Sequence, residues 1–195
     1  DHFYDDMLHA PSALYPMGTD GVGGDVLTLV IYGTRTSLRI GILVALISCT
    51  IGTLVGGVSG YLGGIADRII SEVLNILMMI PTFFLIILAI SLYGSSIDNM
   101  ILIMAFSGWA GSSLLFRGQA LAIREKTFIK NAEVLGIGKW QIIVRHVIPN
   151  CIFPVLTSMA MSVSGAILSE AGLSFLGLGD ANVVSWGKLI AAGRR

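Results

Sequence analysis

Long apolar runs separated by short charged segments dominate this chain. Asp, Glu, Lys and Arg are absent from four stretches of 27, 25, 18 and 24 residues: 40–66, 73–97, 99–116 and 146–169. A helix needs about 20 predominantly apolar residues to cross the hydrocarbon core of a bilayer. The pattern therefore predicts an all-α membrane protein with spans near 38–62, 70–94, 99–118 and 147–170.

Small residues recur at every fourth position of the first predicted span. Residues at this spacing share one helix face, where small side chains let a second helix approach closely. The general tolerance of membrane helices for glycine accounts for only one or two of them. We therefore expect a tight helix–helix contact along Ser48, Gly52, Gly56, Gly60 and Gly64.

Prolines and glycines mark the segments that interrupt or flank the spans. Pro81 falls inside the second span, where its missing N–H and its ring predict a kink. Prolines and glycines also break residues 1–25 into an irregular, water-facing segment, and a lead-in helix is expected to start near Asp25. The glycine-rich tail after residue 170 is expected to lie along the membrane face or to re-enter it.

The distribution of Lys and Arg sets the expected orientation. Residues 117–145 carry six of these cations, and this density predicts a cytoplasmic loop with both chain ends outside. Residues 1–34 would then form an extracytoplasmic segment with a lead-in helix, and residues 35–193 the membrane domain. The chain starts with Asp1 rather than Met, and cytoplasmic termini would need one more span at each end. We therefore expect an interior piece of a longer, six-span protein.

Composition narrows the functional classes. Charged residues make up 12% of the chain, about half the usual share for a soluble domain, and the formal net charge of zero gives no reason to expect a nucleic-acid partner. Cys49 and Cys151 lie in predicted spans and are expected to be small apolar fillers. No phosphate-binding GxxxxGK[ST] loop is present, so we expect no nucleotide site. Near the start of the chain lie four residues of types that can bind metals, but no neighbouring residues support a metal site there. We therefore expect none from His2, Asp5, Asp6 and His9.

The cation-rich loop also carries apolar residues. "TFIKNAEVLGI" predicts a short helix closed by Gly136, and a second helix is expected from near Lys139 into the membrane, with Pro149 near its base. An ordinary solvated loop needs no large apolar side chains, whereas an apolar set rimmed by charge is typical of a docking site for a partner protein. The expected anchors are Phe128, Ile129, Ala132, Leu135 and Trp140.

This loop resembles the EAA loop of ABC-importer permeases, whose pattern is Glu-Ala-Ala, three residues, Gly, nine residues and Ile-x-Leu-Pro. Ala132, Gly136 and Pro149 match it, and Ile148 is a close replacement. Three positions differ: Lys130 stands in place of the pattern's Glu, Asn131 in place of an Ala, and His146 in place of an Ile. We therefore assign the expected coupling role to the shape of 128–140 rather than to the acidic position.

Two further segments resemble the dipeptide, oligopeptide and nickel branch of these permeases. They are "MGTDGVGGDVLTLVIYGTRTSL" at 17–38 and "LSEAGLSFLGLG" at 168–179, the latter continued by "WGKLIAAGR" at 186–194. The resemblance implies a type I ABC-importer permease core, in a prokaryotic inner membrane, that lacks the family's first and last spans here. Peptides are the expected substrate, with nickel and oligosaccharides as alternatives.

The resemblance also implies partners. They are a homologous second permease, two ATPase subunits that carry ATP and Mg, and an external solute-binding protein; the chain itself would be a non-catalytic subunit that binds no cofactor. Loop 117–146 would dock on an ATPase subunit. The residues assigned to this coupling are Phe128, Lys130, Asn131, Ala132, Glu133, Gly136, Trp140 and Pro149.

Polar residues in the spans are candidates for a transport pathway. Asn75 and Glu170 are the two we select, because intramembrane polar groups are often functional. Serines there commonly just bond a carbonyl one turn back. A secondary transporter with broken helices is the rival class; it predicts a charged residue inside a span, and the four charge-free stretches lack one. An intramembrane Ser–His protease fits less well, since His146 is the only histidine near a span.

Overall fold

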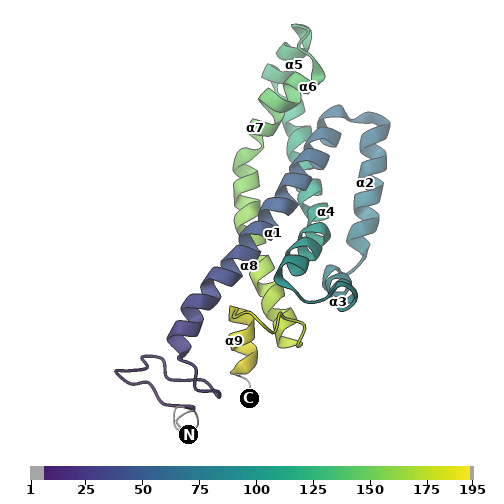
Figure 1. The fold of residues 1–195 in the computed structure, drawn as a ribbon. Coiled ribbons are helices and arrows are strands. Elements are labelled where there is room, and N and C mark those ends of the chain that lie inside the picture. Colours follow the sequence, from purple (N-terminus) through teal and green to yellow (C-terminus); the bar gives the residue numbers. More distant parts are fainter. Residues whose placement is uncertain (1–6, 194–195) are drawn as a thin grey trace.

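The computed structural model describes residues 7–193, apart from the side chain of Ile152. His2, Asp5 and Asp6, considered above as metal-ligand types, lie outside the described residues. Over these residues the fold is helical (Figure 1). In chain order its helices are α1 (Val26–Leu62), α2 (Gly64–Met79), α3 (Thr82–Tyr93), α4 (Ile97–Arg124), α5 (Thr127–Val134), α6 (Lys139–Ile142), the π-helix η1 (Ile143–Val147), α7 (Ile148–Asn150), α8 (Ile152–Phe175) and α9 (Trp186–Ala192).

Helix α1 is the longest element, and its ends follow from local chemistry. The Asp25 carboxylate caps its first turn by accepting from the backbone N–H groups of Leu27 and Thr28 at 3.3 and 3.2 Å. The hydrogen bond from the Thr28 hydroxyl is the main cause that lowers the pKa of Asp25. The helix stops at Gly63, whose φ of +64° favours glycine. Its 37 residues give a length of about 55 Å, which exceeds the thickness of a bilayer core.

Helices α1 and α4 pack in direct backbone contact. A Cβ atom added to Gly56 would lie 2.0 Å from the carbonyl oxygen of Ser113, and one on Gly60 would lie 2.6 Å from that of Arg117. A Cβ atom on Gly52 would lie 2.5 Å from a side-chain carbon of α4. The Ser48 hydroxyl donates to the carbonyl oxygen of Ala105 at 2.9 Å. We call this contact between α1 and α4 the glycine seam.

Gly64 does not belong to the glycine seam, contrary to the prediction. Helix α1 ends at Leu62, so the four-residue spacing no longer describes one helix face beyond that point. Gly64 starts α2 with a φ of +69°, and nothing lies within 4 Å of a Cβ atom placed there. Its role is therefore in the turn between the helices.

Two of the four expected spans are continuous helices, and two are bent pairs. Helices α1 and α4 are each long and apolar enough to cross a membrane. The predicted span 70–94 bends at Pro81, as expected, and is divided there into α2 and α3, which meet at 78°. Ile80 is extended, with φ −83° and ψ 122°, because the ring of a following proline disfavours the helical conformation. The fourth span is a pair bent by 60° near residue 151.

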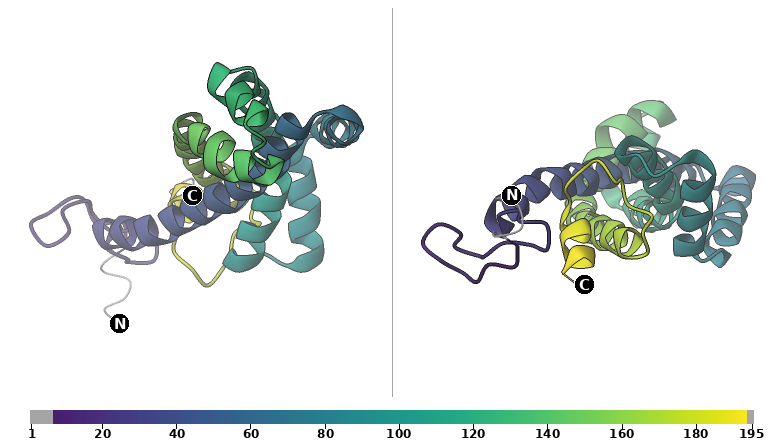
Figure 2. Two further views of the ribbon diagram at one scale, coloured as in Figure 1. Left: turned by 90° about the horizontal axis from the view of Figure 1, so that it is seen from above. Right: turned by 60° about the horizontal axis from the view of Figure 1, so that its bottom comes forward.

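The two ends of the bundle are built differently. Helices α5 and α6 lie at one end, whereas the N-terminal segment and α9 lie at the other (Figures 1 and 2). The tail does not run free along a surface: the backbone N–H of Trp186 donates to the Ser37 hydroxyl at 3.1 Å, and its indole N–H donates to the carbonyl oxygen of Val30 at 3.2 Å. Helix α9 therefore packs on the first half of α1.

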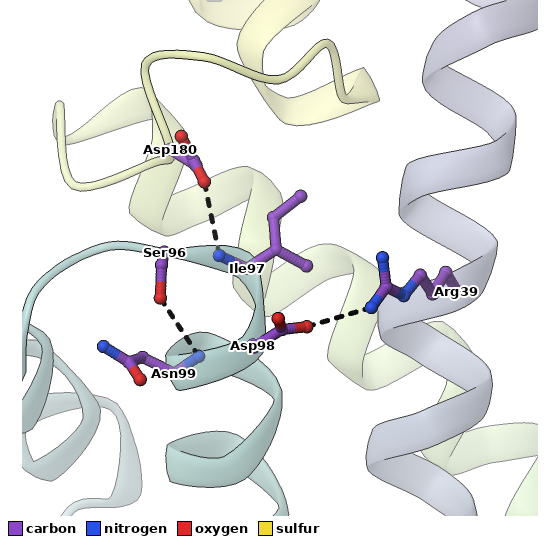
Figure 3. Close-up of polar contacts among 6 residues, drawn as sticks. All are labelled: Arg39, Ser96, Ile97, Asp98, Asn99 and Asp180. Carbon is purple, nitrogen blue, oxygen red and sulfur yellow. Dashed lines mark hydrogen bonds and ion pairs between the residues drawn. The ribbon is translucent and has the colours of Figure 1, made fainter.

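Three chain segments meet where α4 begins (Figure 3). The Ser96 hydroxyl accepts from the backbone N–H of Asn99 at 3.4 Å, and Asp180 accepts from that of Ile97 at 3.3 Å. Asp98 forms an exposed ion pair with Arg39 of α1 at 2.9 Å. These contacts fix the end of α4 that lies away from α5.

Buried side chains form two clusters along the bundle. One joins α1, α3, α4 and α8 around Ile40, Ile90 and Met104. The other joins the loop helices to the ends of α1 and α4, and contains Tyr61 and Cys151. Cys49 and Cys151 are both buried, free thiols.

Candidate partner-docking site

The predicted loop is shorter than expected and forms a compact hook. Helix α4 continues to Arg124, so residues 117–124 are helical rather than part of the loop. Helix α5 then ends in a turn closed by Gly136, with φ +76°. The backbone N–H of Ile137 donates to the carbonyl oxygen of Ala132 at 3.1 Å, and that of Gly136 donates to Glu133 at 3.0 Å. This is a Schellman motif, which satisfies carbonyl groups at the helix end. We call residues 125–147 the hook.

Two of the expected partner anchors instead face the interior of the chain. Ile129 and Ala132 have 0% and 6% exposure, and they pack with Ile142, Ile143 and Val147. They lie three positions apart, on one face of α5, and this face is turned toward the ends of α1 and α4. Ala132 therefore helps to fasten the hook to the bundle, and its assignment to the coupling of the ATPase stays a prediction.

The hook also carries exposed apolar side chains on α5, α6 and η1. We call this set the outer face, and its members have 44, 87, 78, 65 and 61% exposure, in order: Phe128, Val134, Leu135, Trp140 and Val144. Sequence reasoning missed Val134 and Val144. Val134 could have been found by assigning Ile129 and Ala132 to one face of α5, since Val134 then falls outside it, whereas Val144 lies in η1.

Some charged residues of the hook have polar partners. Lys130 pairs with Glu125 at 2.8 Å, and the hydrogen bond from Lys130 lowers the pKa of the Glu125 carboxyl. Glu133 accepts a hydrogen bond from the hydroxyl of Tyr61 at 2.8 Å. Asn131 is exposed. Because the Lys130–Glu125 pair is exposed to water, its contribution to stability is small.

The hook joins the fourth span through an irregular helix. Residues Ile143–Val147 form a π-helical turn, and Pro149 follows within α7. Proline has no N–H to donate, so the regular α-helical bonding pattern is interrupted here. Pro149 is exposed but lies beyond the hook, so the structure groups it with the fourth span rather than with the outer face. Turns of this kind occur often at functional sites.

The two pathway candidates lie in different surroundings. Asn75 is exposed on α2 and remains a prediction. Glu170 has 3% exposure, and one of its oxygens accepts from the hydroxyls of Ser174 and Ser185, both at 2.7 Å. It therefore lies inside the junction of α8 and α9 rather than on an open surface, and its assignment to a pathway stays a prediction. Several span serines bond the carbonyl four residues back, as Ser107 does to Ile103.

One ion pair near the hook was not foreseen. Arg117 of α4 binds the carboxylate of Asp67 in α2 through two bonds of 2.6 and 2.7 Å, and the two side chains are 28% and 12% exposed. Asp67 and Leu74 are the buried residues of α2, and both hold this helix to the bundle. A sequence signal did exist, because both charges immediately follow charge-free stretches that end on the same predicted side of the membrane.

We expect Asp67→Asn to destabilise the protein, because it leaves a partly buried guanidinium without its carboxylate. The expected loss is about 2 kcal/mol in the free energy of unfolding. The matched control is Asp98→Asn, which breaks the exposed pair with Arg39 and should cost less than about 1 kcal/mol. Thermal unfolding in detergent measures both, and equal losses would show that the Asp67 pair does not hold α2.

Comparison with known proteins identifies the family of the chain. Residues 52–190 match the family described as binding-protein-dependent transport system inner membrane component. The chain belongs to this family. With its long apolar helices, it is a multi-pass protein of the inner membrane. The type I permease fold expected from the sequence is thereby confirmed.

Individual relatives carry peptide-transport names. The chain is 41% identical over 177 residues to the oligopeptide transport system permease protein OppC of Haemophilus influenzae, covering 90% of this chain and 57% of that protein. It is 39% identical to the OppC protein of Mycobacterium bovis, covering 97% and 68%. It is 37% identical to the dipeptide transport system permease protein DppC of Bacillus subtilis, covering 91% and 56%. The chain thus spans between about half and two thirds of the length of these relatives.

Proposed function

We propose that this chain is the permease subunit of an ATP-driven importer for di- or oligopeptides. Family membership supports transport, and the names of the relatives support peptides over nickel or oligosaccharides. The observation that carries the role within an importer is the outer face. It holds large exposed apolar side chains on a hook fastened to the bundle by Ile129 and Ala132.

The outer face has the chemistry of a protein-binding surface. Trp140 and Phe128 are aromatic, and aromatic side chains are enriched among the residues that contribute most to protein interfaces. Leu135 adds a third large apolar side chain, and Lys130 and Glu125 lie close by as a polar rim. We assign an ATPase subunit, with its ATP and Mg, to this surface on the cytoplasmic side. A homologous second permease and an external solute-binding protein complete the proposed assembly.

The bend at Pro81 is a feature shared with secondary transporters, but it does not favour that class here. Broken helices in secondary transporters bind substrate and coupling ions at their free ends. No charged side chain lies between Glu72 and Asp98, so the break between α2 and α3 brings no ionisable group to the bend. The importer remains the better supported function.

Reconstitution of the complete transporter in proteoliposomes tests the proposal. The assembly would be purified through this subunit, and uptake of a labelled dipeptide and a labelled pentapeptide would be measured with ATP and with a non-hydrolysable analogue. We expect uptake of peptide only with ATP and solute-binding protein present. Uptake of nickel or of an oligosaccharide instead of peptide would overturn the substrate assignment, and ion-driven uptake without ATP would overturn the importer.

A further inference from the structure

Tyr61 occupies the point where the last turn of α1 meets the hook. It has 3% exposure, and its ring belongs to the buried cluster that contains Ile129 and Ala132 of α5 and Ile143 of η1. Its hydroxyl passes beyond this apolar cluster and donates to a carboxylate oxygen of Glu133 at 2.8 Å. A hydrogen bond to an ionised acceptor is about twice as strong as a neutral one. Tyr61 therefore joins α1 to α5 through both packing and a directed polar contact.

The other side of this contact is rigid. The backbones of α1 and α4 lie too close at Gly52, Gly56 and Gly60 for a side chain to fit between them. Helix α1 therefore cannot slide easily along α4. The seam runs along α1 up to the turn that contains Tyr61. A displacement of α5 that reaches Tyr61 is consequently passed to α1 and α4 together.

The covalent route from the hook to α8 is less direct. It runs through the π-helical turn at Ile143–Val147, past Pro149, and across a 60° bend. Irregular turns and prolines are where helices bend. We expect this route to bend when the hook moves, although Ile143, Val147 and Cys151 lie in the same buried cluster as Tyr61.

We propose that Tyr61 is the positioning residue that couples the hook to the bundle, by holding Glu133 of α5 against the end of α1. This inference rests on the proposed function, in which an ATPase subunit moves the hook. The chain would then transmit that movement through the Tyr61–Glu133 contact into α1 and across the glycine seam into α4, beside the direct connection of α5 to α4 through Glu125 and Lys126. A carboxylate oxygen of Glu133 serves as the acceptor for Tyr61 and not as a contact to the ATPase.

Conservative variants separate coupling from folding. Tyr61→Phe keeps the buried ring and removes only the hydroxyl, and Glu133→Ala removes the acceptor. Glu133→Gln keeps an amide oxygen that accepts the same hydrogen bond and serves as the matched control. In the reconstituted transporter, the number of peptides imported per ATP hydrolysed should fall about fivefold or more in Tyr61→Phe and Glu133→Ala, and stay within about twofold of the parent in Glu133→Gln.

Two further measurements decide between coupling and plain stability. Co-purification of the ATPase and the basal rate of ATP hydrolysis should be unchanged in Tyr61→Phe, and the double variant Tyr61→Phe with Glu133→Ala should transport no less per ATP than either single variant. Unchanged transport per ATP in Tyr61→Phe would overturn the inference, and so would a parallel loss of ATPase binding. ATP-dependent peptide uptake by the unmutated transporter tests the proposed function separately from this inference.

Discussion

Gly56→Ala lowers the free energy of unfolding by about 3 kcal/mol, because the added methyl group meets the backbone of α4. A Cβ atom at this position would lie 2.0 Å from the carbonyl oxygen of Ser113, which belongs to a helix backbone and cannot rotate away as a side chain does. The two helices must separate to admit it. Thermal or denaturant unfolding of the purified protein in detergent measures the loss.

The neighbouring glycine provides the matched control. Nothing lies within 4 Å of a Cβ atom on Gly57, so Gly57→Ala adds the same methyl group one residue away without a clash. It should be neutral or stabilise the helix by about 0.5–1 kcal/mol, since alanine loses less backbone entropy than glycine. Equal stability of the two variants would contradict the glycine seam.

Trp140→Ala weakens binding of the ATPase subunit by about 30-fold or more, while leaving the stability of the permease unchanged. Trp140 is 65% exposed, so truncation creates no cavity in the chain itself. A buried tryptophan at the centre of an interface commonly contributes 2 kcal/mol or more, which corresponds to this change in affinity. The dissociation constant between the permease assembly and the isolated ATPase measures it.

A charge variant of the same hook is the control for Trp140. Lys130→Ala breaks the exposed ion pair with Glu125 and should change the affinity by less than about fivefold, because exposed pairs contribute little. A larger loss for Lys130→Ala than for Trp140→Ala would show that docking depends on charge. It would then contradict the assignment of docking to the outer face.

Much of the fold could be predicted because the charge pattern reports the membrane directly. A charged side chain is costly in the hydrocarbon core, so charge-free stretches mark the helices. The turn at Gly136 could also be placed, since a left-handed backbone position after a helix favours glycine. These are local rules, and they depend on few residues.

Other features depend on packing between distant segments. The pattern around Pro81 predicts a break, but the 78° angle depends on how α3 packs against α4. Glu170 was assigned to a pathway on residue type alone, whereas its burial depends on Ser185, fifteen residues later. Ile129 faces a buried cluster that contains Tyr61, which is far away in the chain. Single-sequence patterns carry no such information.

Site-specific photo-crosslinking in native membranes tests the central claim most directly, that the outer face docks the ATPase. A photoreactive amino acid would be placed at Leu135 on the hook, and at Leu14, which is equally exposed near the opposite end of the bundle. We predict a crosslink from position 135 to the ATPase subunit and none to it from position 14. Crosslinking of the ATPase from position 14, with none from position 135, would contradict it.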